Sequence, residues 1–176
     1  MNTYIALFRG INVGGKNILP MKDLANILED MGYEDVKTYI QSGNVVLRSK
    51  KKKTNKAAGE ISSKILNSHE FEPKVLLIEI SGFKEAIENC PFRTEHGKAL
   101  HFYFLDSPPI KPDIEGLKAV KSKSEEFKLR KKIFYLFAPD GIGRSKLAAK
   151  VERCLGVPAT ARNWNTVRKL MSMAKQ

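Results

Sequence analysis

The sequence predicts an α+β protein made of two similar halves, residues 1–80 and 81–176, and three observations lead to this prediction. Along the first half, short apolar runs alternate with stretches of helical spacing in the order β-α-β-β-α-β. The second half repeats this order loosely, without repeated sequence. The runs at 3–9 and 73–80 are apolar on both parities, so both faces of their sheet should be buried. This order is that of the ferredoxin-like fold, or α–β plait, so two such subdomains packed together are expected.

In the first half, strands are expected at the apolar runs 3–9, 36–41, 44–49 and 73–80. Helices are expected where apolar residues recur at helical spacing, at 21–31 and 57–68. Pro20 suits the start of the first helix and Gly32 its end. Ser42 and Gly43 predict a tight hairpin turn, and 49–56 is a polar, lysine-rich loop.

In the second half, helices are expected at 83–89, 113–120, 145–155 and 163–174. Strands are expected at 99–106, 125–130 and 132–138, with a short edge strand at 160–162. On the helix 145–155, the side chains of Lys146, Lys150 and Arg153 share an outward face. This basic ridge suits a phosphate backbone or is simply a solvated helix face. The aromatic residues of the strands are expected to be buried rather than to stack on RNA bases.

Composition narrows the class of protein. The 176 residues are 42% hydrophobic, which excludes a wholly disordered chain, and their formal net charge is +12. Residues 1–88 carry 13 basic and 11 acidic side chains, and residues 89–176 carry 18 and 8. Such a field attracts polyanions, although a solvated basic surface needs no partner. With no apolar run of roughly 20 residues, no evident signal peptide and two isolated cysteines, we expect a cytoplasmic protein without a membrane partner.

Four segments carry a resemblance to a known family. They are YIALFRGINVGGKNILPMKDL at 4–24, YIQSGNVVL at 39–47, CPFRTEHGKALHFYFL at 90–105 and TARNWNTVRKLMSMA at 160–174. The sequence resembles the bacterial family catalogued as domain of unknown function 1697, over nearly the whole chain. The resemblance implies a pair of α–β plait subdomains. It implies no activity, substrate or catalytic residue.

The loop RGINVGGKN at 9–17 is the strongest candidate for ligand binding. Successive glycines let backbone amides converge on an anion, and an arginine and a lysine supply charge. The candidate ligand-binding residues are Arg9, Asn12, Gly14, Gly15, Lys16 and Asn17. The alternative is that the glycines only satisfy turn geometry, since the loop matches neither the P-loop nor the Rossmann pattern. The hairpin tip at 41–44 is expected at the opposite end of the sheet.

The segment that opens the last helix is a second candidate. Its candidate ligand-binding residues are Arg162, Asn163, Trp164 and Asn165. The arginine and the two asparagines can bind an anion or a base edge. The alternative is that Asn163 or Thr160 caps the helix while Trp164 packs in the core.

No catalytic residue, metal site or cofactor is predicted, because the histidines lack metal-ligand spacing and no nucleophile motif is present. The leading hypothesis is noncatalytic binding of a phosphate-bearing ligand, with nucleic acid first and a phosphorylated small molecule second. One alternative is an enzyme acting on a phosphorylated or carboxylated small molecule in a cleft between the halves. Another is a structural or interaction module. A homo-oligomer is the other way to cover the apolar sheet faces.

Overall fold

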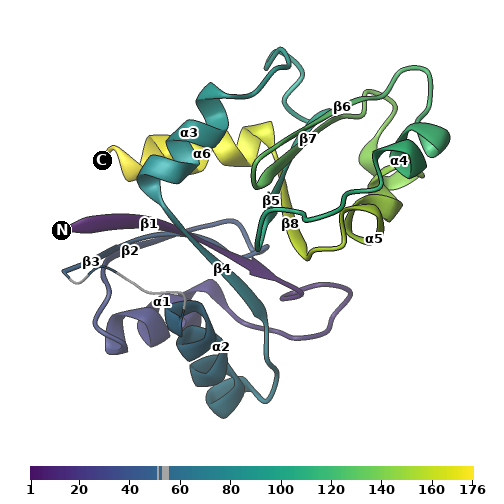
Figure 1. Cartoon of the computed structure of the whole chain (residues 1–176). Helices are drawn as coiled ribbons and strands as arrows, with labels where there is room; N and C mark the ends of the chain where they lie inside the picture. The colour runs from purple at the N-terminus through teal and green to yellow at the C-terminus, as the bar shows by residue number, and fades with distance from the viewer. Residues whose placement is uncertain (51, 53–55) are drawn as a thin grey trace. The chain divides into compact units, whose positions relative to one another are not determined.

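A computed structural model describes residues 1–50, 52 and 56–176 of the chain (Figure 1). The chain divides into two compact units, and each is described by itself. Unit 1 comprises Met1–Glu85 together with Lys169–Gln176, and unit 2 comprises Ala86–Arg168. Part of the polar loop expected at 49–56 lies outside the described residues.

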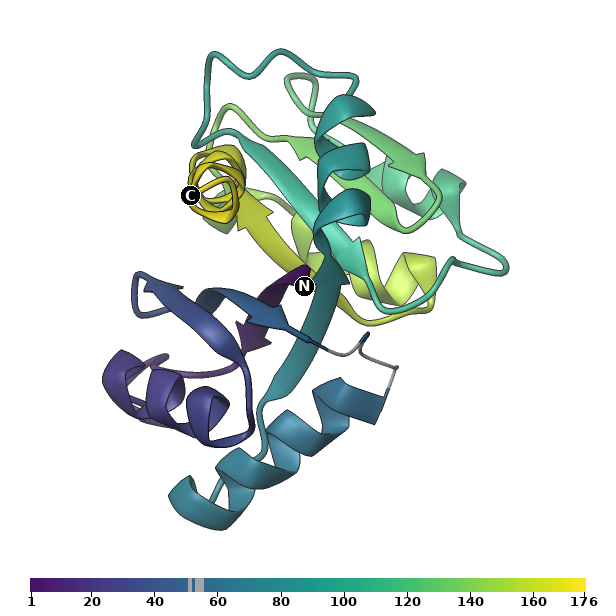
Figure 2. The same ribbon diagram turned by 90° about the vertical axis from the view of Figure 1, so that its left-hand side faces the viewer.

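Unit 1 contains a four-stranded antiparallel sheet in the order β2-β3-β1-β4. Its strands are β1 (Asn2–Arg9), β2 (Glu34–Tyr39), β3 (Asn44–Ser49) and β4 (Lys74–Glu79). Helices α1 (Met21–Asp30) and α2 (Lys56–His69) lie side by side on one face of this sheet (Figures 1 and 2). This is the predicted ferredoxin-like arrangement.

The core of unit 1 follows from the alternation along β1. Tyr4, Ala6 and Phe8 point to the face that α1 and α2 cover and pack with residues of both helices. Ile5 and Leu7 point to the other face and are also fully buried. The prediction that both faces are buried is therefore confirmed for β1, but only in part for the run 73–80, because the residues from Val75 to Glu79 are half-buried.

Unit 2 contains a second antiparallel sheet with the equivalent order, β6-β7-β5-β8. Its strands are β5 (Leu100–Leu105), β6 (Glu126–Arg130), β7 (Ile133–Phe137) and β8 (Ala159–Asn163). Helices α4 (Ile114–Val120) and α5 (Val151–Leu155) lie on one face, and β8 is the predicted edge strand. The two-plait architecture is confirmed.

In both sheets the fourth strand runs directly into a helix. β4 ends at Glu79 and α3 (Ile80–Glu88) begins at the next residue, although the sequence placed Ile80 in the strand and started the helix at Phe83. β8 likewise continues into α6 (Trp164–Ala174) without an intervening residue. The repeated element order is thus β-α-β-β-α-β-α rather than the six-element plait alone.

The prediction of one continuous helix at 145–155 is wrong. Two single 3-10 turns, Ile142–Arg144 and Ala148–Lys150, precede the short α5. The Ser145 hydroxyl accepts the Ala148 amide at 2.9 Å, so a serine cap starts the helical stretch. Lys150, at φ −108° and ψ −2°, then departs from regular helix geometry. The predicted basic ridge therefore does not lie along one regular helix, although its three side chains are exposed.

The aromatic residues of the second sheet are buried, as expected. Phe102 and Tyr135 have no exposed surface, and their rings meet edge to face at 5.0 Å. Phe102 also stacks on Trp164 at 5.8 Å. These rings are not available as a stacking platform for bases.

Glu125 is a buried carboxylate that ties two loops of unit 2 together. It accepts hydrogen bonds from the Ser122 amide, at 3.0 Å, and from the Ser145 hydroxyl. Burial alone raises the pKa of Glu125, but these hydrogen bonds and the Lys121 ammonium outweigh it, so the pKa lies below its ordinary value. Burial, followed by the charges of Glu125 and Glu152, raises the pKa of nearby Tyr103 to about 12.

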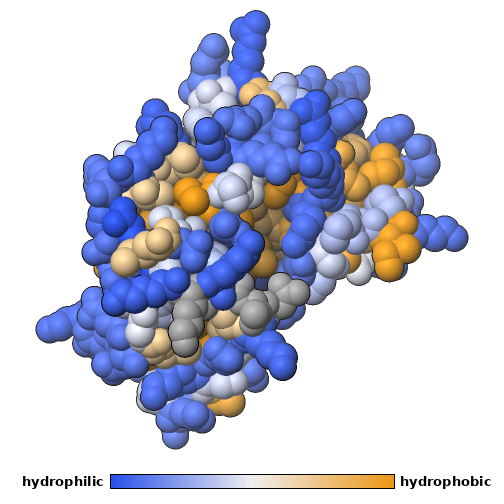
Figure 3. Space-filling model, turned by 60° about the vertical axis from the view of Figure 1, so that its left-hand side comes forward, coloured by the Kyte–Doolittle hydropathy of each residue, from blue (hydrophilic) through white to orange (hydrophobic). Residues whose placement is uncertain are grey.

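Among the described residues, no helix combines the length and the apolar character needed to cross a bilayer. The face shown in Figure 3 is mainly hydrophilic, with hydrophobic side chains in small groups.

We expect Glu125→Gln to flatten the acid limb of the stability profile. Because the folded-state pKa is below the unfolded value of about 4.3, the wild-type carboxylate stabilises the fold above that pH, and this contribution is lost as the pH falls through the lowered folded-state pKa. Melting temperatures measured from about pH 6 to pH 3 check this. Glu126→Gln, at the exposed neighbouring position, is the control and should keep the wild-type profile. Equal acid sensitivity of wild type and Glu125→Gln would contradict the expectation.

Candidate functional site

The loop that leaves β1 turns on its two glycines. Gly14 and Gly15 have φ values of +57° and +71°, and the Lys16 amide donates to the Val13 carbonyl at 3.0 Å. Two consecutive residues with positive φ are the mark of a type I′ turn, which glycine adopts without strain. Turn geometry alone therefore accounts for both glycines.

Two asparagines close this loop. The Asn12 carboxamide donates to the carbonyls of Leu19, at 2.9 Å, and Gln41, at 2.8 Å, and accepts the Leu19 amide at 2.8 Å. The Asn17 side chain donates to the Gly10 carbonyl at 2.9 Å. Both side chains serve the backbone of the protein, so they position the loop.

The hairpin tip between β2 and β3 lies against this loop, and its predicted placement at the opposite end of the sheet is wrong. β1 and β2 are both antiparallel to β3, so they run in the same direction and end at the same edge. The Asn12–Gln41 hydrogen bond and a 2.8 Å bond from the Phe8 amide to the Gly43 carbonyl join the two loops. The turn also contains four residues, 40–43, rather than two, because Tyr39 pairs with Asn44.

The two cations of the loop differ in their surroundings. Arg9 ends β1 opposite Lys74 of β4, is half-buried and has partners within the protein. Lys16 stands exposed beside the turn. The loop thus presents one fully exposed cation.

In unit 2, most of the second group of predicted residues have roles in the fold. Asn163 accepts the Thr166 amide at 3.0 Å, which caps α6. Trp164 packs on the buried Phe102. Arg162 is half-buried and donates to its neighbour's carbonyl, and burial lowers the pKa of its guanidinium to about 10, which leaves it charged at neutral pH. Asn165 alone of the four is exposed.

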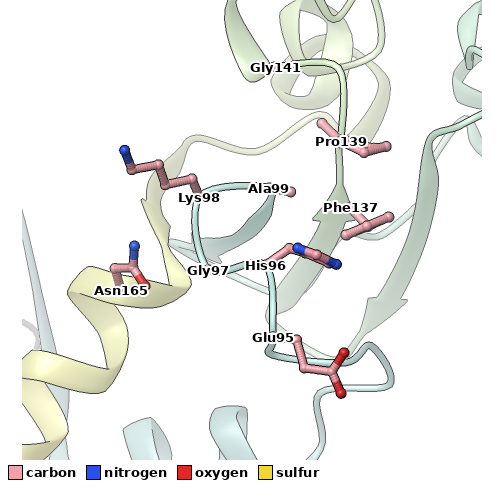
Figure 4. A pocket seen from close by; sticks show the side chains of 10 residues that line it. Glu95, His96, Gly97, Lys98, Ala99, Phe137, Pro139, Gly141 and Asn165 are labelled. Atoms are coloured by element: carbon pink, nitrogen blue, oxygen red, sulfur yellow. The ribbon is translucent and has the colours of Figure 1, made fainter.

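Asn165 borders an open pocket of about 690 Å³ within unit 2 (Figure 4). The walls come from the loop before β5, the end of β7 with the residues that follow it, and the first turn of α6. The lining residues are Glu95, His96, Gly97, Lys98, Ala99, Phe137, Ala138, Pro139, Gly141 and Asn165. In Figure 4, Lys98 and Asn165 extend on one side of the loop, and His96 and Phe137 on the other.

Backbone hydrogen bonds hold the walls of the pocket. The His96 carbonyl accepts the Ala99 amide at 2.9 Å, and the Ala99 carbonyl accepts the Ala138 amide at 2.9 Å. Gly97 lies so close to α6 that a Cβ there would come within 2.0 Å of the Asn165 carboxamide oxygen. Position 97 therefore lies in contact with the Asn165 side chain at the amino end of the helix, and a larger residue there would require that exposed side chain to turn away.

The pocket combines groups that suit an anion. The amino end of an eleven-residue helix adds positive potential, and Lys98 adds a full charge. His96 and Glu95 supply groups that can exchange protons, and Phe137 supplies part of an aromatic wall. No group of three or more His, Cys, Asp or Glu side chains among the described residues could hold a metal ion.

Sequence reasoning missed the residues 95–99 and 137–141. They lie in loops without periodic pattern, and the pocket forms only when the fold brings them to Asn165. The one available signal was the run EHGK at 95–98, in which a histidine, a glycine and a lysine adjoin.

The comparisons with known proteins agree with this fold. The family model described as "Protein of unknown function (DUF1697)" matches residues 1–135, so the match ends within β7, before α6. The solved structure of the conserved bacterial protein SP0830 from Streptococcus pneumoniae is similar, with a TM-score of 0.74 and 26% sequence identity over 98% of each chain. No curated protein matches the chain.

We expect Gly43→Ala to be markedly destabilising. Gly43 has φ +82°, and a Cβ would lie 2.5 Å from Phe8 Cβ and 2.7 Å from Ile11 Cδ1. Strain and overpacking together should cost about 2–4 kcal/mol, measured by urea denaturation. Gly32, at φ +83° with open space around it, is the matched control, and Gly32→Ala should cost only about 1 kcal/mol. Equal losses of stability in Gly43→Ala and Gly32→Ala would show that the close contact with Phe8 and Ile11 does not add to the destabilisation.

We expect Asn163, which precedes α6, and Asn165, in its first turn, to differ in how much they contribute to stability. Asn163→Ala removes the helix cap and should destabilise unit 2 by about 1 kcal/mol. Asn165→Ala removes only an exposed side chain and should change stability by less than about 0.5 kcal/mol. Denaturant midpoints of the two variants provide the comparison, and the reverse ranking would contradict the assignment of the cap.

Proposed function

We propose that this chain, which belongs to the DUF1697 family of proteins of unknown function, binds a phosphate-bearing ligand in the pocket of unit 2. The observation that carries the proposal is that Lys98 and Asn165 line one pocket, with Asn165 in the first turn of α6. The proposal is of binding without chemical change to the ligand.

The recognition would be electrostatic with a hydrogen-bonding component. The aligned dipole of α6 favours negative charge at its amino end, where Asn163 already accepts the Thr166 amide. Lys98 can approach a phosphate as a flexible point charge, and the Asn165 carboxamide can donate to a phosphate oxygen. A volume of about 690 Å³ is of the size that small-molecule sites have.

His96 and Phe137 favour a ligand with a ring beside its phosphate. In Figure 4 they lie across the loop from Lys98 and Asn165. A base or another planar group can contact them while its phosphate reaches the cationic side. A nucleotide unit has both parts.

Nucleic acid is the source of such a unit that we place first. The net charge of +12 draws polyanions to the surface. Because Phe102, Phe104, Phe134 and Tyr135 are buried and Phe137 of β7 is only half-buried at the pocket, a strand would contact the protein through phosphates and through one base at the pocket. A free nucleotide presents the same chemistry without the neighbouring phosphates.

A small-molecule enzyme is the second candidate. The observation that favours it is the pair of exposed side chains Glu95 and His96 in the same pocket. A histidine side chain can serve as a general acid or base towards a phosphorylated substrate. Release of product from a bound ligand would distinguish this candidate from simple binding.

We expect Lys98→Ala to weaken binding of a fluorescein-labelled single-stranded RNA of about ten nucleotides by roughly tenfold, because it removes a charge-assisted contact. Fluorescence anisotropy over a range of salt concentrations gives the dissociation constants. The salt slope should also fall by about one, as expected for one lost phosphate contact. Lys111→Ala, at an exposed lysine of unit 2 outside the pocket, is the control.

Competition distinguishes the sources of phosphate. A nucleoside monophosphate that displaces the RNA at the pocket supports a nucleotide-sized site, and displacement by inorganic phosphate alone indicates that the ring contributes nothing. If wild type binds neither RNA nor nucleotide at low salt, or if Lys98→Ala binds as tightly as wild type, the proposal fails.

A further inference from the structure

Three large apolar side chains stand exposed on unit 1 beside the β1 loop. Val13, Ile18 and Ile40 are 66%, 57% and 51% exposed. We call this set the apolar loop surface. Among the described residues, only Met1, Leu66 and Ile110 are other large hydrophobics with comparable exposure. Exposed hydrophobic side chains that stand singly are normal, whereas several on adjoining segments suggest an interaction site.

The three side chains belong to one hydrogen-bonded framework. Val13 follows Asn12, Ile18 follows Asn17, and Ile40 precedes Gln41. Asn12 donates from its side chain to the Gln41 carbonyl at 2.8 Å and from its backbone amide to the Asn17 carbonyl at 3.0 Å. The framework therefore fixes the apolar side chains on neighbouring stretches of backbone.

Ile40 is an unfavourable choice for the fold. Its φ of +50° lies in the left-handed region, which β-branched residues rarely adopt. Glycine or asparagine would take this conformation with less strain, and the half-exposed side chain gains little from burial. Folding therefore does not explain an isoleucine here, whereas a contact with another molecule does.

The charge around the apolar loop surface limits what that molecule is. Residues 9–19 and 40–44 contain no aspartate or glutamate, and Lys16 is a fully exposed cation among them. A partner with carboxylates beside its apolar side chains is complementary. A second copy of the chain would bring like charges together, and three side chains provide much less than the roughly 800 Å² per partner of a standard interface.

We infer that the apolar loop surface docks a short acidic segment of a partner protein that carries apolar side chains. The inference goes beyond the proposed ligand pocket and does not depend on it, because all the residues involved lie in unit 1.

The test selects binders from a display library of random peptides of about 15 residues on the immobilised full-length chain. Selected peptides should be rich in Asp or Glu and in apolar residues. Ile40→Asn should weaken their binding by at least about tenfold while raising the unfolding midpoint, because asparagine tolerates positive φ. Lost binding is then not a loss of folding.

Two further variants complete the design. Lys16→Glu should also weaken the selected peptides, because it reverses the exposed charge, and added salt should weaken wild-type binding. Ile110→Asn removes an isoleucine that is 99% exposed in unit 2 and should leave binding unchanged.

Four outcomes would overturn the inference. The first is a selection that yields no binders, or binders without acidic and apolar residues. The second is equal binding by Ile40→Asn. The third is a dimer, seen by sedimentation velocity, that Ile40→Asn dissociates, which would assign the surface to a second copy. The fourth is binding to phosphatidylglycerol vesicles that Ile40→Asn abolishes, which would assign it to lipid.

Discussion

Each sheet depends on a central strand that is buried on both faces. In β1 the residues from Tyr4 to Phe8 are at most 3% exposed, and in β5 every residue is at most 8% exposed. Such a strand pairs with neighbours on both edges and packs with side chains on both faces, so its position is strongly determined. A loop attached to such a strand therefore begins or ends at a fixed position. The loop that leaves β1 carries the apolar loop surface, and the loop that enters β5 forms a wall of the pocket.

Several asparagine side chains form hydrogen bonds with backbone groups at the ends of these strands. Asn12 and Asn17 bond to loop backbone, and Asn44, fully buried, donates to the Tyr39 carbonyl at 3.1 Å. Asn163 caps α6. Each satisfies backbone groups that the sheet or helix leaves over. Asn165 has no such role among the hydrogen bonds found for the described residues, and that difference separates it as a candidate for ligand contact.

The architecture could be predicted from the sequence because its strands are short apolar runs and its helices have clear apolar spacing. The four strands of each sheet and the burial on both parities of β1 follow from these patterns. The broken helix at 145–155 could not be predicted in the same way, because apolar spacing at Leu147, Val151 and Leu155 is satisfied equally by a helix interrupted at Lys150.

The candidate sites were harder to predict because they depend on tertiary placement. The contact between the β1 loop and the β2–β3 turn follows from the relative direction of the strands, because β1 and β2 run parallel on either side of β3. The predicted split βαβ order implies this direction, so the placement of the turn at the opposite end was an error in applying that order. The importance of Gly97 shows only in its closeness to Asn165, a residue far along the chain. Nor does propensity indicate that Ile40 adopts a positive φ. The polar and glycine-rich segments could be identified from the sequence, but the residues that each of them contacts could not.

The composition of unit 1 has a consequence for biosynthesis. Its residues run from Met1 to Glu85 and then resume at Lys169, so the last turns of α6 are part of it. The β1–β4 sheet is encoded by the first 79 residues, whereas residues 86–168 must be made before the last part of unit 1 is present. Unit 1 can therefore complete its packing only after the segment that forms unit 2 has been synthesised, which couples the folding of the two units in time.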